Sequence, residues 1–183
     1  MKKLILSIAA IAMGAFLSNN VMAQTTAVTE NTTAGAVLVV PMGITETSAL
    51  HFGTIIMTDA LGGTVTLSTA NVRSETGGLA LTGITPVSSN AAYNVTGTMN
   101  ETYALTAPVT ITVSETLLGV ASMDITNLTV LYNGGIEKPA VNSTSLLSGT
   151  GTDNFAIGGL LTVKAAQLAG VYAGTFDVTV DYN

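Results

Sequence analysis

The last nine residues of the chain, TFDVTVDYN at positions 175–183, decide its fold class. Apolar Phe176, Val178, Val180 and Tyr182 alternate with polar residues, so an extended chain places all four on one face. This strict period of two is typical of a β-strand that buries one face against a core and exposes the other.

The composition of the whole chain agrees with this strand. Of 183 residues, 48% are hydrophobic and 9% are charged, and the chain holds 30 Thr and 19 Gly. Ordinary soluble domains carry about 25% charged residues. β-Branched residues favour strands and Gly favours tight turns. After residue 23 no segment keeps an apolar period of 3.6 residues, so we expect an all-β protein, an immunoglobulin-like two-sheet sandwich.

Short apolar runs predict the other strands, and Gly pairs at 62–63, 77–78, 134–135 and 158–159 predict turns between them. Residues 142–154 are polar and Gly-rich and predict a long surface loop, and residues 164–168 allow one helical turn. Strands are expected over residues 51–57, 64–68, 91–96, 109–114, 125–132, 160–164 and 175–182.

The first 23 residues have the features of a secretory signal peptide. Lys2 and Lys3 precede an apolar run over 4–17, and short residues lead to a cleavage site between Ala23 and Gln24. A membrane-spanning helix needs about 20 apolar residues, and the polar residues 18–20 end this run too early. The exported chain then comprises a flexible leader over 24–33 and a single domain over 34–183.

Charge and cysteine content exclude several functions. After cleavage three basic residues remain against eleven acidic ones, whereas nucleic acid needs clustered Lys and Arg, so we expect no nucleic-acid partner. The chain has no Cys. A disulfide and a lipid anchor on a cysteine at position 24 are both excluded, and the core must be held by packing and strand pairing.

The residues that carry chemistry elsewhere occur here singly. His51 is the only imidazole and lies between Leu50 and Phe52 in a predicted strand, and no Gly-x-Ser-x-Gly elbow exists. Asp153 beside Asn154 suggests a weak Ca²⁺ ligand, but a plain turn is the better interpretation. Residues 149–151 lack the rest of a dinucleotide motif. We expect no catalytic residue, no metal site and no cofactor, and therefore no enzyme.

A second alternating stretch lies near the amino terminus. Ala34, Ala36, Leu38 and Val40 share one face of an extended chain, and Pro41 ends the stretch because it has no N–H for a ladder. The pattern predicts a strand over 34–40.

Four stretches carry a resemblance to a known family: LHFGTI at 50–55, GTVTL at 63–67, RSETGG at 73–78 and GVYAGTFDVTVDYN at 170–183. They resemble an uncharacterised exported family of Gram-negative bacteria that is similar to spore coat U domains and archaic chaperone-usher pilins. Such pilins have a penultimate aromatic residue in the last strand and a Gly fourteen residues from the end. Tyr182 and Gly170 stand at these two positions.

The resemblance implies a sandwich that lacks one strand. A periplasmic chaperone first lends a strand, and after passage through an outer-membrane usher the next subunit replaces it with its own amino-terminal extension. It also implies that Gly170, Phe176, Val178, Val180 and Tyr182 form the last strand that chaperone and neighbour recognise. Ala34, Ala36, Leu38 and Val40 are then either the donor strand or the chain's own first strand.

Two functions follow as expectations. The first is a structural subunit of a surface filament or coat, exported through the periplasm and assembled head to tail with copies of itself by donor-strand complementation. The alternative is a monomeric adhesin or other binding module on the same sandwich.

Overall fold

The computed structural model describes residues 27–133 and 135–183. The chain divides into two units, Met1–Val37 and Leu38–Asn183. In the first unit, residues 27–37 are exposed and belong to no helix or strand. The predicted signal peptide, with its cleavage site at Ala23 and Gln24, lies outside the described residues. Every strand described below belongs to the second unit.

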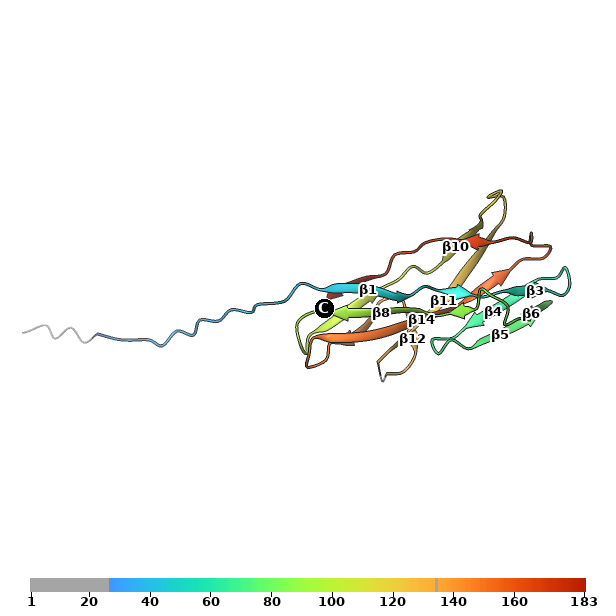
Figure 1. Ribbon diagram of the computed structural model, residues 1–183. Coiled ribbons are helices and arrows are strands. Elements are labelled where there is room, and N and C mark those ends of the chain that lie inside the picture. The colour runs from blue at the N-terminus through green and yellow to red at the C-terminus, as the bar shows by residue number, and fades with distance from the viewer. Residues whose placement is uncertain (1–26, 134) are drawn as a thin grey trace, which may run out of the picture. The chain divides into compact units, whose positions relative to one another are not determined.

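A large antiparallel sheet forms one layer, in the order β1-β8-β14-β11-β10-β15, with β4 paired to β14 and β5, and β12 paired to β11. Figure 1 shows β14 running alongside β8 and β11. The strands of this sheet are β1 (Gly43–Ser48), β4 (Gly63–Leu67), β5 (Arg73–Gly77), β8 (Ala91–Thr96), β10 (Ile111–Glu115), β11 (Ser122–Tyr132), β12 (Lys138–Pro139), β14 (Thr152–Val163) and β15 (Tyr172–Ala173).

Smaller antiparallel sheets complete the fold. The three-stranded sheet has the order β13-β9-β16, and two short pairs are β2-β7 and β3-β6. Their strands are β2 (His51–Phe52), β3 (Ile55–Met57), β6 (Leu79–Leu81), β7 (Ser88–Ser89), β9 (Thr102–Thr106), β13 (Ser143–Leu146) and β16 (Thr179–Tyr182). The described residues contain no helix, so the expected all-β sandwich is confirmed.

Aromatic residues join the large sheet to the three-stranded sheet, which forms the second layer. Tyr93, Phe155 and Tyr132 lie side by side across β8, β14 and β11, with ring centroids 5.0 and 5.8 Å apart. Tyr103 comes from β9 in the other sheet, and its ring packs edge-on against Tyr132 at 6.1 Å. The Tyr103 hydroxyl donates to the Asp153 carboxylate at 2.9 Å, and both residues are buried. Burial and the nearby Asp153 raise the pKa of Tyr103.

Several predicted boundaries were wrong. The predicted loop 142–154 contains β13 and the start of β14, because buried Leu147 and Asp153 belong to the core. The predicted strand 160–164 is the end of the longer β14. Residues 165–166 form a turn within 164–168 rather than a helical turn. The strand over 91–96 is confirmed as β8.

The Gly pair at 158–159 forms no turn. Both glycines are buried within β14, where backbone atoms of residues 67–69 at Gly158 and side chains of β11 at Gly159 leave no room for a Cβ. A Cβ at Gly159 would lie 2.8 Å from the Leu128 side chain and 3.1 Å from that of Ile125, both on the adjacent β11. The glycines therefore permit close packing rather than a change of direction.

Candidate functional site: an open edge between the first and last strands

The first strands of the domain form one edge. β1, β2 and β3 follow one another in sequence and pair on one side only, with β8, β7 and β6 in turn. Within the described residues their other side pairs with no strand. This edge, from Gly43 to Met57, presents backbone N–H and C=O groups to any chain that can pair with them.

The predicted strand 51–57 is broken at Gly53, which has a φ of 76°. The Gly53 N–H donates to Nδ1 of the His51 ring at 2.8 Å. The Arg73 guanidinium donates to the carbonyls of Phe52 at 2.8 Å and Thr82 at 2.6 Å. A Cβ at Gly53 would lie 2.9 Å from the Ser88 backbone nitrogen, and the φ of 76° disfavours other residues, so glycine is required here.

The last segment forms the opposing edge. β15 pairs with β10 in the large sheet and β16 pairs with β9 in the small sheet. Between them, residues 174–178 cross from one layer to the other without a ladder partner among the described residues. The predicted strand 175–182 is therefore paired only from Thr179, because its first half serves as the crossing. The alternation nevertheless persists: Phe176, Val178 and Tyr182 are half-buried and Val180 is buried.

An apolar cavity of about 560 Å³ lies beside both edges. We call it the edge cavity. Its lining combines residues 50–57 from the first edge with residues 167–172 from the last segment, over a floor of core side chains. The floor consists of Val113, Met123, Ile125, Leu161 and Val163. Gln167 donates to the Tyr172 hydroxyl at 2.8 Å, which in turn donates to the Leu168 carbonyl at 2.6 Å.

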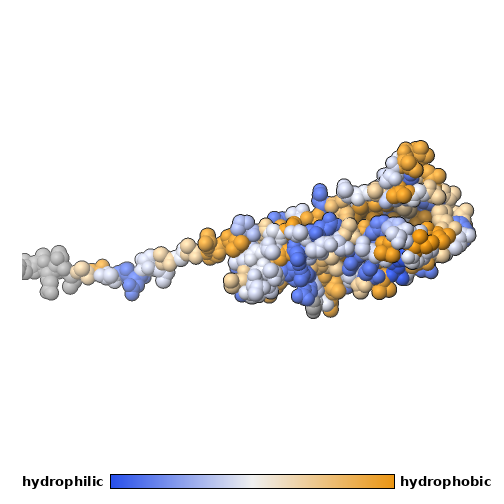
Figure 2. Space-filling view, viewed as in Figure 1, coloured by the Kyte–Doolittle hydropathy of each residue, from blue (hydrophilic) through white to orange (hydrophobic). Residues whose placement is uncertain are grey.

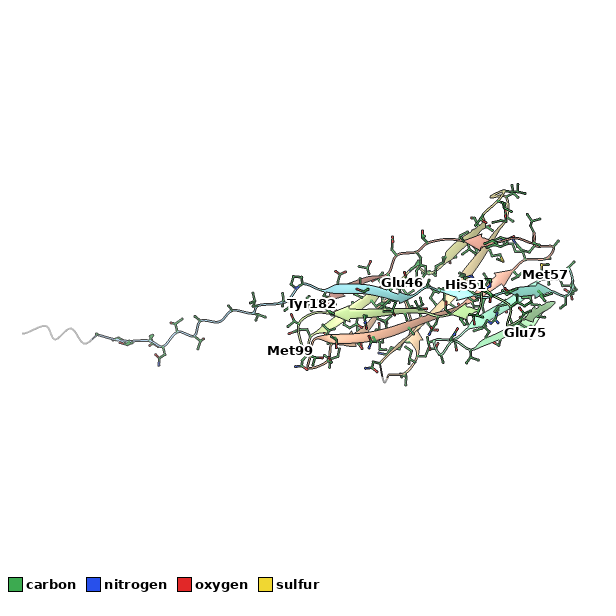
Figure 3. The ribbon with its side chains drawn as sticks, viewed as in Figure 1. Glu46, His51, Met57, Glu75, Met99 and Tyr182 are labelled. Carbon is green, nitrogen blue, oxygen red and sulfur yellow. The ribbon has the colours of Figure 1, made fainter. Side chains whose placement is uncertain are left out.

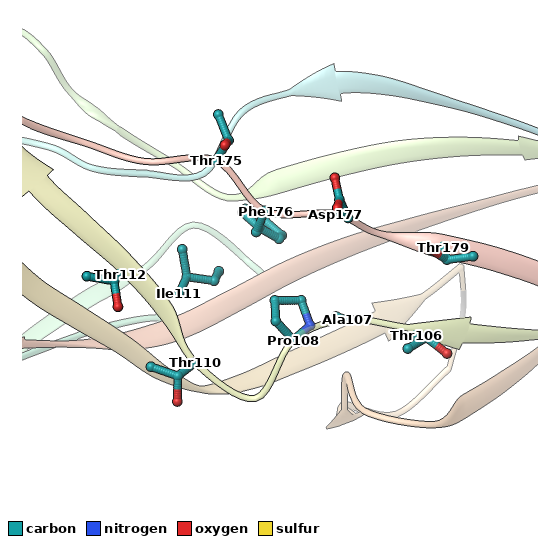
Figure 4. Close-up of a pocket in the computed structure, with 10 residues that line it drawn as sticks. All are labelled: Thr106, Ala107, Pro108, Thr110, Ile111, Thr112, Thr175, Phe176, Asp177 and Thr179. Carbon is teal, nitrogen blue, oxygen red and sulfur yellow. The ribbon is translucent and has the colours of Figure 1, made fainter.

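A smaller cavity of about 380 Å³ lies where the last segment crosses between the layers. Figure 4 shows Phe176 between Ile111 and Pro108 on one side and Thr175 and Asp177 on the other. The core is thus accessible at two places along residues 167–179.

Tyr182, at the end of the last strand, bonds this strand to the residues that precede β1. Its hydroxyl donates to the Val40 carbonyl at 2.5 Å and accepts the Thr98 N–H at 2.6 Å. The Val40 N–H in turn donates to Oγ1 of Thr98 at 2.6 Å. We call this set the Tyr182 clasp. A Cβ at Gly97 would lie 2.6 Å from the Tyr182 hydroxyl, so the clasp also requires glycine at 97.

The residues of the predicted donor strand pair with no strand in the described structure. Ala34 and Ala36 are exposed, Leu38 is 94% exposed, and the first strand of the domain begins later, at Gly43. Val40 is also exposed, but both of its backbone polar groups belong to the Tyr182 clasp. The alternative in which residues 34–40 form the domain's own first strand is not what this structure shows.

Gly170 has a local role that the sequence did not reveal. It lies beside the Glu115 side chain, where a Cβ would approach Cγ of Glu115 to 2.9 Å. The Glu115 carboxylate accepts the N–H groups of Leu117 and Leu118 at 2.9 and 2.6 Å. These backbone hydrogen bonds, that of Leu118 first, lower the pKa of Glu115.

The residues considered for chemistry have structural partners instead. The ring of His51 accepts a backbone N–H, as described above, and Asp153 accepts hydrogen bonds from Tyr103 and from Ser145 at 2.9 and 2.7 Å. Asp153 lies in β14 rather than in a turn. In residues 27–133 and 135–183 no three His, Asp or Glu side chains gather as a metal site would require.

The sequence did not predict the roles of Thr98, Arg73 and Glu115, whose side chains hold backbone segments in place. Thr98 and Arg73 bond backbone of distant segments, and Glu115 bonds the backbone of its own turn; such bonds leave no periodic signal in the sequence. None of the described residues belongs to a helix with the length and hydropathy needed to span a membrane.

The sequence matches a known family. A family model described as "Domain of unknown function (DUF4402)" matches residues 42–182, from the start of the first edge to the penultimate tyrosine. No curated protein matches the sequence.

Proposed function

The chain belongs to the DUF4402 family, and we propose that it serves as a structural subunit of a bacterial surface filament or coat, assembled by donor-strand complementation. The observation that supports this most is the open edge. Among the described residues, the first strands and the last segment each lack a strand partner on their outer side, and these two edges flank an apolar cavity. An exposed apolar segment precedes the domain in sequence. One incoming strand would satisfy the free backbone groups and cover the apolar floor.

The donor would be the segment that precedes the clasp. Ala34, Ala36 and Leu38 present one face of an extended chain. The backbone N–H and C=O of Val40 are bonded within its own subunit. The donor would therefore end before Val40, and Val40 itself would not pair with a strand of the neighbour. Burying Leu38 would contribute about 1.5–3 kcal/mol, before the ladder hydrogen bonds are counted.

Repetition of this contact gives a filament. The donor segment and the open edge are different surfaces of one subunit, so the contact is heterologous, and its repetition gives an open filament where the rotation between subunits does not close a ring. Before assembly, a periplasmic chaperone would cover the open edge and an outer-membrane usher would deliver the subunit to the cell surface. This role needs no catalytic residue, metal or cofactor.

A second candidate is a monomeric binding module. The volume of the edge cavity, about 560 Å³, falls within the range of small-molecule sites, and its floor is apolar. In that case an apolar ligand rather than a neighbouring strand would occupy it.

One experiment separates the two candidates. Protein sheared from the surface of producing cells is run on a denaturing gel with and without boiling. A strand-complemented filament dissociates only if a subunit unfolds in large part, so its resistance to detergent is kinetic. A ladder of multiples that collapses on boiling supports the filament. A single band in both lanes contradicts it and favours the binding module.

A further inference from the structure

The hairpin between β10 and β11 ends in a tip of exposed aliphatic side chains. Leu117, Leu118 and Val120 are 86%, 71% and 76% exposed. Figure 2 shows a strongly hydrophobic projection at one end of the domain. A single exposed leucine is ordinary, but three aliphatic residues within one turn form a patch of the kind that marks an interaction surface. We call these three residues the hairpin tip.

The hairpin tip is held in one conformation. The Glu115 carboxylate accepts the backbone N–H groups of residues 117 to 119, and Gly119 adopts a φ of 65°. The Glu115 N–H pairs with the Ala121 carbonyl at 2.9 Å. A turn ordered in advance loses little conformational entropy when it binds, which favours a contact surface over a mobile loop.

The hairpin tip and the Tyr182 clasp lie at opposite ends of the last segment. The Thr116 N–H donates to the Val171 carbonyl at 2.9 Å, which fixes the hairpin beside residue 171. Residues 171–182 then lead to the clasp and can span at most roughly 35 Å, at about 3.3 Å per residue. Figure 3 shows Tyr182 together with Met99 at one end of the domain and Met57 at the other.

The clasp end carries aliphatic groups of its own. Val40, Met99 and Leu146 are 57%, 61% and 55% exposed. Val40 and Met99 lie together because Val40 is bonded to Thr98, and Leu146 pairs with Thr102 at the start of β9. We call Val40, Met99 and Leu146 the tail face, since the donor segment leaves the domain there.

The chemistry of the two surfaces selects the partner. Residues 116–121 contain no charged side chain, and neither does the tail face. The chain as a whole has a net charge of −6, so an anionic lipid surface would repel it. A second copy offers an uncharged aliphatic surface of matching chemistry.

We propose that the hairpin tip of one subunit packs against the tail face of the next copy in the filament. This rests on the proposed function. The edge cavity is lined by Val171, the residue bonded to the hairpin, so the cavity lies at the hairpin end of the last segment. The donor leaves its own subunit at the tail face immediately after Leu38, so placing Leu38 in the edge cavity brings that face to the neighbour's hairpin. The contact adds apolar burial outside the groove and fixes the angle between successive subunits.

Cysteine cross-linking tests this contact cleanly, because the chain contains no native Cys. Met99→Cys is combined in turn with Leu117→Cys, Leu118→Cys and Val120→Cys in the full chain, and sheared filaments are oxidised, boiled and run without reductant. A disulfide requires Cβ atoms about 3.5–4.5 Å apart, so it reports direct contact. Testing three tip positions keeps one unfavourable register from hiding the contact.

The expected result is a ladder of three or more subunits that survives boiling and collapses with reductant in at least one double variant. Each single variant should give no species beyond a dimer. The matched control combines Leu118→Cys with Ile136→Cys, an equally exposed aliphatic position in the β11–β12 connection, and should also give no ladder.

Two other results overturn the inference and are distinguishable. If the unboiled ladder persists but no double variant forms a boiling-resistant ladder, the filament stands and the hairpin contact is wrong. If the parent protein gives no unboiled ladder, the proposed filament fails, and the contact between successive subunits fails with it.

Discussion

The hydroxyl of Tyr182 donates to the carbonyl of Val40, 142 residues earlier in the chain. The penultimate residue of the chain thereby fixes the point at which the amino-terminal segment leaves the domain. Residues upstream of Val40 are free of this constraint, whereas the backbone of Val40 is fully used. The same tyrosine thus ends the last strand and sets the start of the proposed donor.

Removing the Tyr182 hydroxyl should loosen this junction without dismantling the strand. Tyr182→Phe keeps the ring but leaves the Thr98 N–H and the Val40 carbonyl without their partner, and we expect a loss of about 1 kcal/mol in the free energy of unfolding. Urea denaturation measures it. Tyr182→Ser also removes the ring from beside Gly97, and it should lower the periplasmic yield. Equal stability of Tyr182→Phe and the parent would contradict the clasp.

A charge in the donor segment should block assembly and spare the fold. Leu38 is almost fully exposed in the subunit, so Leu38→Asp should leave the unfolding free energy within about 0.5 kcal/mol of the parent. In the neighbour's groove the same carboxylate would be desolvated without a partner, and the unboiled ladder should disappear. Val37→Asp is the matched control, because the adjacent residue is also exposed but would point away from the neighbour's groove in an extended donor. Normal filaments from Leu38→Asp would contradict the donor assignment.

The hairpin tip should lose its order in acid. The pKa of the Glu115 carboxyl is lowered in the fold below its ordinary value of 4.5 by the backbone N–H groups of Leu118 and Leu117. A carboxyl with a lowered pKa stabilises the fold fully above its unfolded value, and this stabilisation is lost as the pH falls through the folded value. Hydrogen-exchange protection of the Leu117 and Leu118 amides should therefore decline in that acid range.

The control for this prediction is a turn that uses no carboxylate. The Gly151 N–H donates to the Ser148 carbonyl at 2.9 Å, and its protection should follow only the global stability. Glu115→Gln should remove the specific acid response of the hairpin. Protection of Leu117 that tracks Gly151 at every pH would show that the carboxylate does not order the turn.

The buried link between the two sheets should show energetic coupling. Asp153→Ala leaves the hydroxyls of Tyr103 and Ser145 without their common acceptor in the core, at a cost of about 1–3 kcal/mol. Tyr103→Phe removes one donor and should cost less, because Ser145 still serves the carboxylate. A double-mutant cycle should give a coupling of at least about 0.5 kcal/mol. Strict additivity would mean that the hydrogen bond contributes nothing to joining the layers.

A side chain at Gly159 should be costly because of packing alone. Gly159→Ala places a Cβ 2.8 Å from Leu128, which cannot move freely in the core, and should destabilise the fold by about 1–3 kcal/mol. Gly83→Ala is the control, since a Cβ there meets nothing within 4 Å. Thermal unfolding compares them, and a neutral Gly159→Ala would show that β11 can retreat from β14.

The sequence predicted the elements whose side chains alternate over a buried face. The strand over 91–96 emerged with the same bounds as β8, and the apolar face of residues 176–182 points inward as expected. The weakly patterned β1 and β5 escaped prediction, since Thr, Ser and Glu dominate their exposed positions. The strand β9 was missed although its buried Tyr103 and Leu105 alternate with other residues. Gly158 and Gly159 were misread because a glycine that allows close packing looks the same in sequence as a glycine that allows a turn.

By itself the sequence determined the fold class and the inward face of the last strand, since side-chain periodicity is a local property of an extended backbone. The tertiary structure decided which strand each edge meets, where residues 174–178 cross between the layers, and that Tyr182 holds Val40. Pairing across 50 to 142 residues depends on which surfaces can be buried together, and no local pattern encodes that choice. The open edge could therefore be located only once the chain was folded.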